Sequence, residues 1–463
     1  MTNSGSKADS YNAITEGVIW KQLLLFFFPI VFGTFFQQLY NTADAVIVGR
    51  FVGKQALSAV GGTTATLINL LVGFFVGVSS GAAVVVSQYY GARQPESVNR
   101  AVHSSFCMAL AGGLCLMIAG ELLTPFAIRA IGTPEDVRDY AVTYMRIIFA
   151  GVIPNLCYNM GAAILRAVGD SRRPLYFLIA ATLCNILLDL LFVAFLHLEV
   201  RGAALATILS QLFSAVLVMR TLMRTEECYR FRLSDLRPDR EILRRVVAIG
   251  FPAGLQSMMY SISNILIQAG INSHGTDTVA AWAAYGKVDG LFWMMLDAMG
   301  IAITTFVGQN YGAGKFRRLR QGTRVGLLLS LVITLSMSVL VVLLGGPLIR
   351  LFTDDPEVLR IAMEMILFLT PLWFTYIFVS VLPCTLRAIG DALHSMIIIA
   401  LGTCGLRILW IFAVARHFTN LRMTIACYPL SWAVTSIVFV IYYRYFSPVK
   451  DLPAEDRELP AGR

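Results

Sequence analysis

Long apolar runs are the feature that most constrains how this chain can fold. Each is about 20 residues long, which is the length an α-helix needs to cross a hydrocarbon core of about 30 Å. Of the 463 residues, 57% are hydrophobic and 14% are charged, whereas soluble proteins average about 25% charged. The runs are continuous and do not alternate in short segments, as the strands of a membrane barrel do. The sequence therefore predicts an all-α integral membrane protein and excludes a soluble globule.

Twelve transmembrane helices are expected from these runs. They are placed at about 22–48, 56–86, 102–121, 140–164, 175–197, 203–222, 245–271, 278–307, 324–345, 361–385, 394–415 and 422–445. The polar stretch 1–12 lacks the basic start and small-residue cleavage site of a signal peptide, so the first run is expected to remain in the mature protein.

The distribution of Lys and Arg among the short loops predicts the orientation. With the N-terminus in the cytoplasm, the inner segments carry 25 of these residues and the outer loops about nine. Because cytoplasmic loops of membrane proteins are enriched in Lys and Arg, both termini are expected inside, in a multi-pass protein of the cytoplasmic membrane. The net charge of +9 is thus a topology signal, and no nucleic-acid partner is expected.

The two halves of the chain repeat each other. LRAVGD at 165–170 recurs as LRAIGD at 386–391, and QYYGA at 88–92 recurs as QNYGA at 309–313, both at a shift of 221 residues. Since six helices separate the copies, the halves are expected to be parallel six-helix bundles related by a pseudo-twofold axis along the membrane normal. The predicted division is an N-lobe at 1–219, a cytoplasmic linker at 220–245 and a C-lobe at 246–463.

Glycine and proline predict where helices pack closely or bend. Gly73, Gly77 and Gly81 are spaced four apart, which favours close contact between helices. Five prolines inside apolar runs each free a backbone carbonyl and favour a bend. They are Pro29, Pro154, Pro252, Pro371 and Pro383.

Four polar residues form the main candidate site, because ionisable residues inside a membrane are costly and usually functional. Asp44 lies near the outer end of the first run, Asn185 and Asp189 share one helix face, and Thr207 begins the sixth run. All four are expected in the outer half of one lobe. They fit either an all-oxygen Na⁺ site or a proton-binding carboxylate pair. The alternative is a polar cluster that only holds helices together.

The second half lacks this cluster. At the repeat offset, apolar residues stand opposite the polar ones, namely Ile267, Leu406 and Trp410. The run 278–307 has its own charges at Lys287, Asp289 and Asp297, which are candidates for a second site or gate. Arg146 and Arg407 are lone intramembrane charges, and we expect structural pairing or proximity to a cavity for both.

Other sites are not indicated. The segment Gly308–Lys315 misses the spacing of a phosphate-binding loop, so an ion gradient is the expected driving force. The eight cysteines and five histidines form no metal or catalytic pattern, which argues against an enzyme. Neither a cofactor nor a metal is expected, apart from a coupling ion, H⁺ or Na⁺, at Asp44, Asn185 and Asp189.

Several motifs together resemble the MATE family, the multidrug and toxic compound extrusion transporters. The resemblance covers nearly the whole chain and is similar to the bacterial branch of DNA-damage-inducible and staphylococcal exporters. Its motifs are QQLYNTADAVIVGR at 37–50, SQYYGA at 87–92, NILLD at 185–189, GAALAT at 202–207, GQNYGA at 308–313 and the two LRA motifs.

The resemblance implies cation-coupled export of organic cations and drugs by rocker-type alternating access. It assigns the coupling ion to Asp44, Asn185 and Asp189, with Thr207 as a matching hydroxyl. Gln37 and Tyr40 match cavity-lining positions, and Asn159 and Tyr260 are further cavity candidates. The acidic residues that another branch carries in its second lobe are absent here, which argues against a second Na⁺ site of that type. We expect a monomer in contact with membrane lipid.

One alternative function follows from the same superfamily. Lipid-linked oligosaccharide flippases resemble these transporters, but they often carry extra helices and several cations that face the cavity. Twelve spans, few intramembrane cations and an anionic first lobe favour a cationic substrate.

Overall fold

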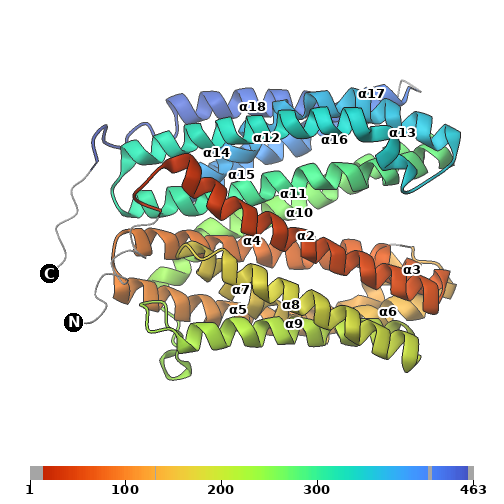
Figure 1. Ribbon diagram of the computed structural model, residues 1–463, viewed down its shortest axis with the longest axis horizontal. Helices are drawn as coiled ribbons and strands as arrows, with labels where there is room; N and C mark the ends of the chain where they lie inside the picture. Colours follow the sequence, from red (N-terminus) through yellow and green to blue (C-terminus); the bar gives the residue numbers. More distant parts are fainter. Residues whose placement is uncertain (1–13, 131, 415–419, 457–463) are drawn as a thin grey trace. The chain divides into compact units, whose positions relative to one another are not determined.

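The structure is a computed structural model that describes residues 14–130, 132–414 and 420–456 (Figure 1). In these residues the chain is helical, as the sequence predicts, without strands. The polar segment 1–12 and the end of the chain at Arg463 lie outside the described residues.

The chain divides into two compact units. One comprises Phe28–Gly254, and the other comprises Met1–Phe27 with Leu255–Arg463. The divide falls inside two long helices, next to Pro29 in one and Pro252 in the other. Each unit is therefore described by itself. The lobe boundaries at 219 and 246 stay a prediction.

The helices of the first half follow one another closely along the chain. They are α2 (Ile19–Phe51), α3 (Lys54–Gly61), α4 (Thr63–Gly91), α5 (Pro95–Ala130), α6 (Glu135–Ala150), α7 (Val152–Ala167), α8 (Arg172–Asp189), the π-helix η1 (Leu190–Phe195) and α9 (Glu199–Arg224). The short 3₁₀-helix η2 (Leu233–Asp235) follows in the central linker.

The helices of the second half repeat this order with more interruptions. They are α10 (Arg240–Asn272), α11 (Thr276–Gly312), α12 (Phe316–Arg350), α13 (Pro356–Leu369), the 3₁₀-helix η3 (Thr370–Tyr376), α14 (Ile377–Ala388), α15 (Ala392–Ile399), the π-helix η4 (Ala400–Gly405), α16 (Leu406–Ala413), α17 (Leu421–Ile425) and α18 (Cys427–Tyr445).

The predicted number of spans is confirmed, with one change in shape. Eleven helices in the described residues are long and apolar enough to cross a membrane, and a bent pair makes a twelfth span. That pair is α6 and α7, which meet at an angle of 52°. The break lies at Gly151, where a side chain would clash with Ile208 of α9. Pro154 lies in the first turn of α7 and cannot donate to the carbonyl of Ala150 at the end of α6, so the bend that the sequence predicts at this proline is confirmed.

Glycines bring α4 and α10 into close contact within the unit Phe28–Gly254. A Cβ atom built on Gly77 would lie 2.5 Å from the Cα of Gly254, and one on Gly81 would lie 2.6 Å from the backbone N of Gly250. Glycine on both helices therefore permits backbone-to-backbone packing. The predicted packing role is confirmed for Gly77 and Gly81.

Gly77→Ala is expected to destabilise the protein by about 1–3 kcal/mol, the usual cost of inserting carbon atoms into a packed contact. Gly286→Ala is the matched control, because a Cβ built on this glycine of α11 meets nothing within 4 Å. Thermal unfolding of the two purified variants in detergent measures the difference. Equal melting temperatures would contradict the close contact.

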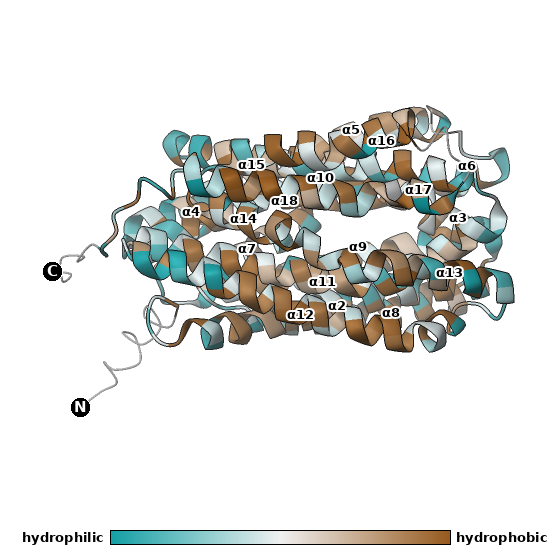
Figure 2. Ribbon diagram, turned by 90° about the horizontal axis from the view of Figure 1, so that it is seen from above, coloured by the Kyte–Doolittle hydropathy of each residue, from teal (hydrophilic) through white to brown (hydrophobic). Residues whose placement is uncertain are grey.

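The exposed faces of several helices are apolar, as a lipid-facing surface requires. Figure 2 shows hydrophobic residues along α8 and α12. In α12 the exposed side chains recur every three or four residues, which is one helical stripe. They are Leu328, Val332, Leu335, Val339 and Leu343.

Basic residues at the start of α12 bind backbone carbonyls near both termini. Lys315 donates to the carbonyl of Thr15, and Arg318 donates to those of Ile14, Glu16 and Gly17. Arg320 donates to the carbonyls of Val449, Leu452 and Pro453. This basic cluster, which the sequence identified only as a topology signal, thus also fixes the segments that flank α2 and α18.

Candidate ion-binding site

Three helices of the unit Phe28–Gly254 carry the predicted polar residues at the same level. Asp44 lies in the last third of α2, Asp189 ends α8, and Thr207 lies near the start of α9. Helices α8 and α9 are consecutive and antiparallel, so the end of one and the beginning of the other come together. Asn185 precedes Asp189 by one turn and lies on the same face.

The structure brings these side chains into one buried cluster. Asn185 and Asp189 are 0% exposed, and Asp44 and Thr207 are also buried. The carboxyl groups of Asp44 and Asp189 are close enough to interact electrostatically. Asn185 lies beside Asp189, but no hydrogen bond of normal geometry joins the two side chains. Two carboxyl groups thus share a site, and among the described residues no cationic side chain forms an ion pair with either of them.

Five oxygen atoms of the cluster are buried without a hydrogen-bond partner among the described residues. They are Asp44 Oδ1, Asn185 Oδ1, Asp189 Oδ1 and Oδ2, and Thr207 Oγ1. Buried polar atoms are normally paired, and leaving one unpaired is costly. Oxygen ligands of this kind suit a hard cation, and a carboxyl pair also suits a bound proton. The residues therefore fit Na⁺ or H⁺. Among the described residues, no cluster of three or more His, Cys, Asp or Glu side chains is arranged to hold a transition metal or zinc.

Two tyrosines border the cluster. Tyr40, one turn before Asp44 on α2, interacts with Asp44, Asp189 and the Thr207 hydroxyl. Tyr144 of α6 approaches the same groups and is one of the residues that sequence reasoning missed. Little in the sequence indicated that Tyr144 belongs to the site, because many residues around it in α6 are also polar.

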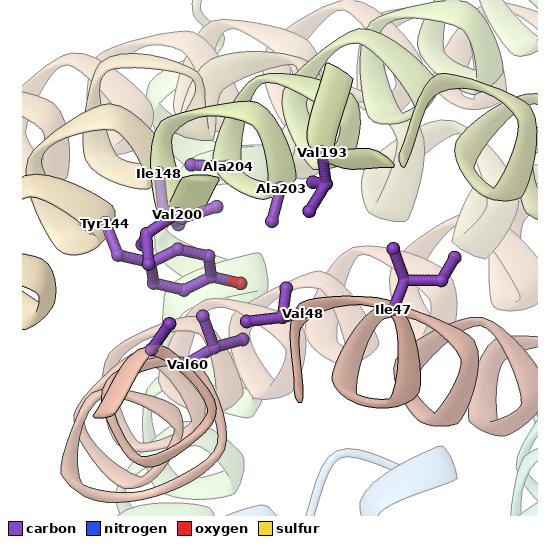
Figure 3. Close-up of a cluster of buried hydrophobic side chains, with 10 residues drawn as sticks. Ile47, Val48, Val60, Tyr144, Ile148, Val193, Val200, Ala203 and Ala204 are labelled. Atoms are coloured by element: carbon purple, nitrogen blue, oxygen red, sulfur yellow. The ribbon is translucent and has the colours of Figure 1, made fainter. Parts of the chain in front are cut away.

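An apolar cluster closes the site on one side (Figure 3). Ile47 and Val48 follow Asp44 by one turn, Val193 follows Asp189 by one turn, and Ala203 precedes Thr207 by one turn. The ring of Tyr144 packs among these side chains, with Val60 and Val200 beside it. These buried apolar side chains lower the dielectric at this end of the polar cluster, which strengthens the electrostatic interactions within it.

The predicted cavity residues Gln37, Asn159 and Tyr260 differ in their surroundings. Gln37 is exposed, and Asn159 donates a short hydrogen bond to Asn155 Oδ1 on the same helix. Tyr260 belongs to the other unit, where its hydroxyl lies 3.1 Å from that of Tyr376. Among the described residues, no hydrogen bond joins these three to the Asp44 cluster, whereas Tyr40 is part of it.

The second unit places Asp289 among aromatic side chains. Trp293 Nε1 donates to its Oδ2 at 2.6 Å, and the Tyr285 hydroxyl donates to its Oδ1 at 3.3 Å. Lys287 and Asp297 are both exposed on α11. In the described part of the chain, Lys287 forms no ion pair with an acidic side chain within 4.0 Å.

The two lone arginines differ in their environment. Arg146 approaches Glu121 of α5 at 3.8 Å. Arg407 is 2% exposed and donates to Ser431 Oγ at 3.1 Å, with its guanidinium 4.4 Å from the centroid of the Tyr428 ring. It interacts electrostatically with Asp289. Arg407 is thus held chiefly by aromatic rings, and its Nη2 atom has no hydrogen-bond partner among the described residues.

A bundle of membrane-spanning helices defines an integral membrane protein, and comparison with known proteins gives its family. The family model described as MatE matches residues 29–191 and again residues 252–412. The two matches confirm the repeat. The chain belongs to the MatE family of multidrug efflux transporters and is not an enzyme.

Relatives and solved structures agree with this assignment. A probable multidrug resistance protein of Bacillus subtilis, YoeA, is 28% identical over 92% of this chain and 94% of its own length. A protein of Shewanella oneidensis named FAD transporter is 24% identical over 85% and 90%, respectively. A structure titled as the outward-facing conformation of a MATE family transporter has a TM-score of 0.89 at 22% identity, covering 98% of this chain and 99% of that one.

Proposed function

We propose that this transporter exports organic cations in exchange for H⁺ or Na⁺, with the coupling ion bound by Asp44, Asn185, Asp189 and Thr207. The buried Asp44–Asp189 pair is the observation that carries this proposal. Two carboxylates without a cationic side chain cannot both stay ionised at low dielectric unless a metal ion binds between them; otherwise one of the two takes up a proton. Binding of a cation therefore relieves the repulsion between the two carboxylates and stabilises the site.

Exchange requires that ion and substrate favour different conformations. An ion shifts an equilibrium only by as much as its affinity differs between the two states. The four side chains of the proposed ion site come from three helices, α2, α8 and α9, so movement of any of them changes the ion's coordination. A cationic substrate and the coupling ion would then stabilise different arrangements of the unit. Gln37, Tyr40, Asn159 and Tyr260 remain proposed substrate contacts.

The substrate class rests on charge. The cluster is anionic and bordered by aromatic rings, which attract organic cations through their faces. The named relatives include both multidrug resistance proteins and an FAD transporter, so family membership alone leaves the substrate open. Asp289, with its aromatic neighbours, and Lys287 and Asp297 are proposed secondary elements of the second unit.

Efflux from membrane vesicles tests the proposal directly. Ethidium, a fluorescent cation, is loaded, and a pH gradient or a Na⁺ gradient is then imposed separately. Ethidium movement driven by one of the two gradients is expected, with no movement of FAD under the same gradient. Transport of FAD but not of ethidium would contradict a cationic substrate, and indifference to both gradients would contradict ion coupling.

The proposed orientation places both termini and the linker 220–245 in the cytoplasm, with one chain acting as a monomer in the cytoplasmic membrane. A cysteine introduced at Arg237, which is exposed, is expected to resist an impermeant thiol reagent added to intact cells. It should react once the cells are permeabilised. The endogenous cysteines, including the exposed Cys115, are replaced beforehand. Reaction in intact cells would reverse the orientation.

A further inference from the structure

Helices α7 and α9 enclose a groove of about 540 Å³ on the surface of the unit Phe28–Gly254. It begins beside the bend at Gly151 and continues along α9 toward its last turn. The lining residues are Ile153, Pro154 and Cys157 of α7, and Leu212, Ala215, Val216, Met219, Arg220, Met223 and Arg224 of α9. The residues from α9 follow a spacing of three and four, so they form one stripe of the helix.

The groove is apolar along its length and basic at one end. Arg220 and Arg224 are both exposed and stand one turn apart at the end of α9. No carboxylate of the described chain forms an ion pair with either guanidinium, although ion pairs are found for Arg100 and Arg173. Two arginines without an ion pair, at the end of an apolar groove, complement a molecule with an anionic headgroup and a hydrocarbon tail.

We propose that this groove binds a phospholipid with a net negative headgroup. Its phosphate accepts hydrogen bonds from Arg220 and Arg224, and one acyl chain lies along the α9 stripe toward the bend between α6 and α7. Basic pockets between transmembrane helices recognise anionic headgroups in this way. A free phosphate would not use the apolar part of the groove, which is why the lipid is the occupant. The site shares none of its lining residues with the Asp44 cluster.

The arginines should set the lipid preference. Each basic residue near a membrane surface contributes attraction equivalent to about a fivefold change in affinity for an anionic lipid. Arg220→Gln combined with Arg224→Gln is therefore expected to weaken binding of phosphatidylglycerol about thirtyfold. Binding of phosphatidylcholine, which has no net charge, should change little.

Native mass spectrometry of the full chain in detergent, with the two lipids at equal concentration, measures this preference. Arg172→Gln combined with Arg244→Gln is the control, because it removes the same charge from exposed arginines outside the groove. Preferential retention of phosphatidylglycerol by the wild type and the control, and its loss in the Arg220/Arg224 variant, is expected. Equal retention of the two lipids by the wild type, or equal effects of both double variants, would overturn the proposal.

A second variant separates a lipid from a bound phosphate ion. Val216→Trp fills the groove at an exposed position and keeps both arginines. It should release phosphatidylglycerol as the loss of the arginines does, and inorganic phosphate should not displace the lipid from the wild type. Displacement by inorganic phosphate, or full retention of the lipid by Val216→Trp, would show that the groove holds no acyl chain.

Discussion

Asp44→Asn is expected to slow ion-driven ethidium efflux at least about tenfold, which corresponds to about 1.4 kcal/mol of lost transition-state stabilisation. The substitution keeps the size and hydrogen-bonding capacity of the side chain, but it removes one of the two carboxyl groups that interact in the buried cluster. With one carboxylate left, the repulsion between the two charges is gone, and the affinity of the site for a cation falls. Efflux from vesicles at matched protein levels measures the effect.

Asp297→Asn is the matched control for this variant. It removes the same charge from an exposed carboxyl group on α11 of the other unit, so its effect should be milder. If Asp44→Asn pumps at the wild-type rate, the cluster only holds α2, α8 and α9 together. A folding defect is distinguished by thermal unfolding of both variants.

The second large effect concerns the charges of Asp289 and Arg407. Arg407→Met removes a buried guanidinium, and Asp289→Asn removes the carboxylate with which it interacts. Because each charge partly compensates the other at low dielectric, the double variant should be more stable than the sum of the single effects predicts. A coupling energy of about 0.5–3 kcal/mol is expected for groups linked in this way.

Thermal unfolding of the single and double variants gives this coupling. The control cycle combines Arg407→Met with Asp297→Asn, since among the described residues no hydrogen bond or ion pair joins Arg407 to Asp297, and the guanidinium donates to Ser431. Additive effects in the first cycle, or equal coupling in both, would contradict a specific interaction between Asp289 and Arg407.

Much of the fold could be predicted because its signals are local. The apolar runs set the number of spans, and repeated motifs showed the two halves that the family model later matched. The bend between α6 and α7 was predictable from Pro154, whereas the need for a glycine at position 151 depends on Ile208 of a distant helix. Contacts between distant helices, such as the one between Gly151 and Ile208, leave no pattern in the local sequence.

The candidate site was partly predictable for a similar reason. The depth of Asp44, Asp189 and Thr207 in their runs indicated that they would meet, and the structure brings them together. Tyr144 was missed, because its contact with them depends on how α6 packs. The hydrogen bond between Tyr260 and Tyr376 was likewise not predictable, because it depends on how two helices of the second unit pack. Periodicity gives the level of a residue but not its neighbours across helices.

Counter-movement of ion and substrate in proteoliposomes tests the central claim most directly. An imposed gradient of ethidium, with no ion gradient, should drive H⁺ or Na⁺ in the opposite direction through the wild-type protein. Asp44→Asn should abolish this ion movement because the buried carboxyl pair is lost. Ethidium flux without ion movement in the wild type, or undiminished ion movement in Asp44→Asn, would contradict the account.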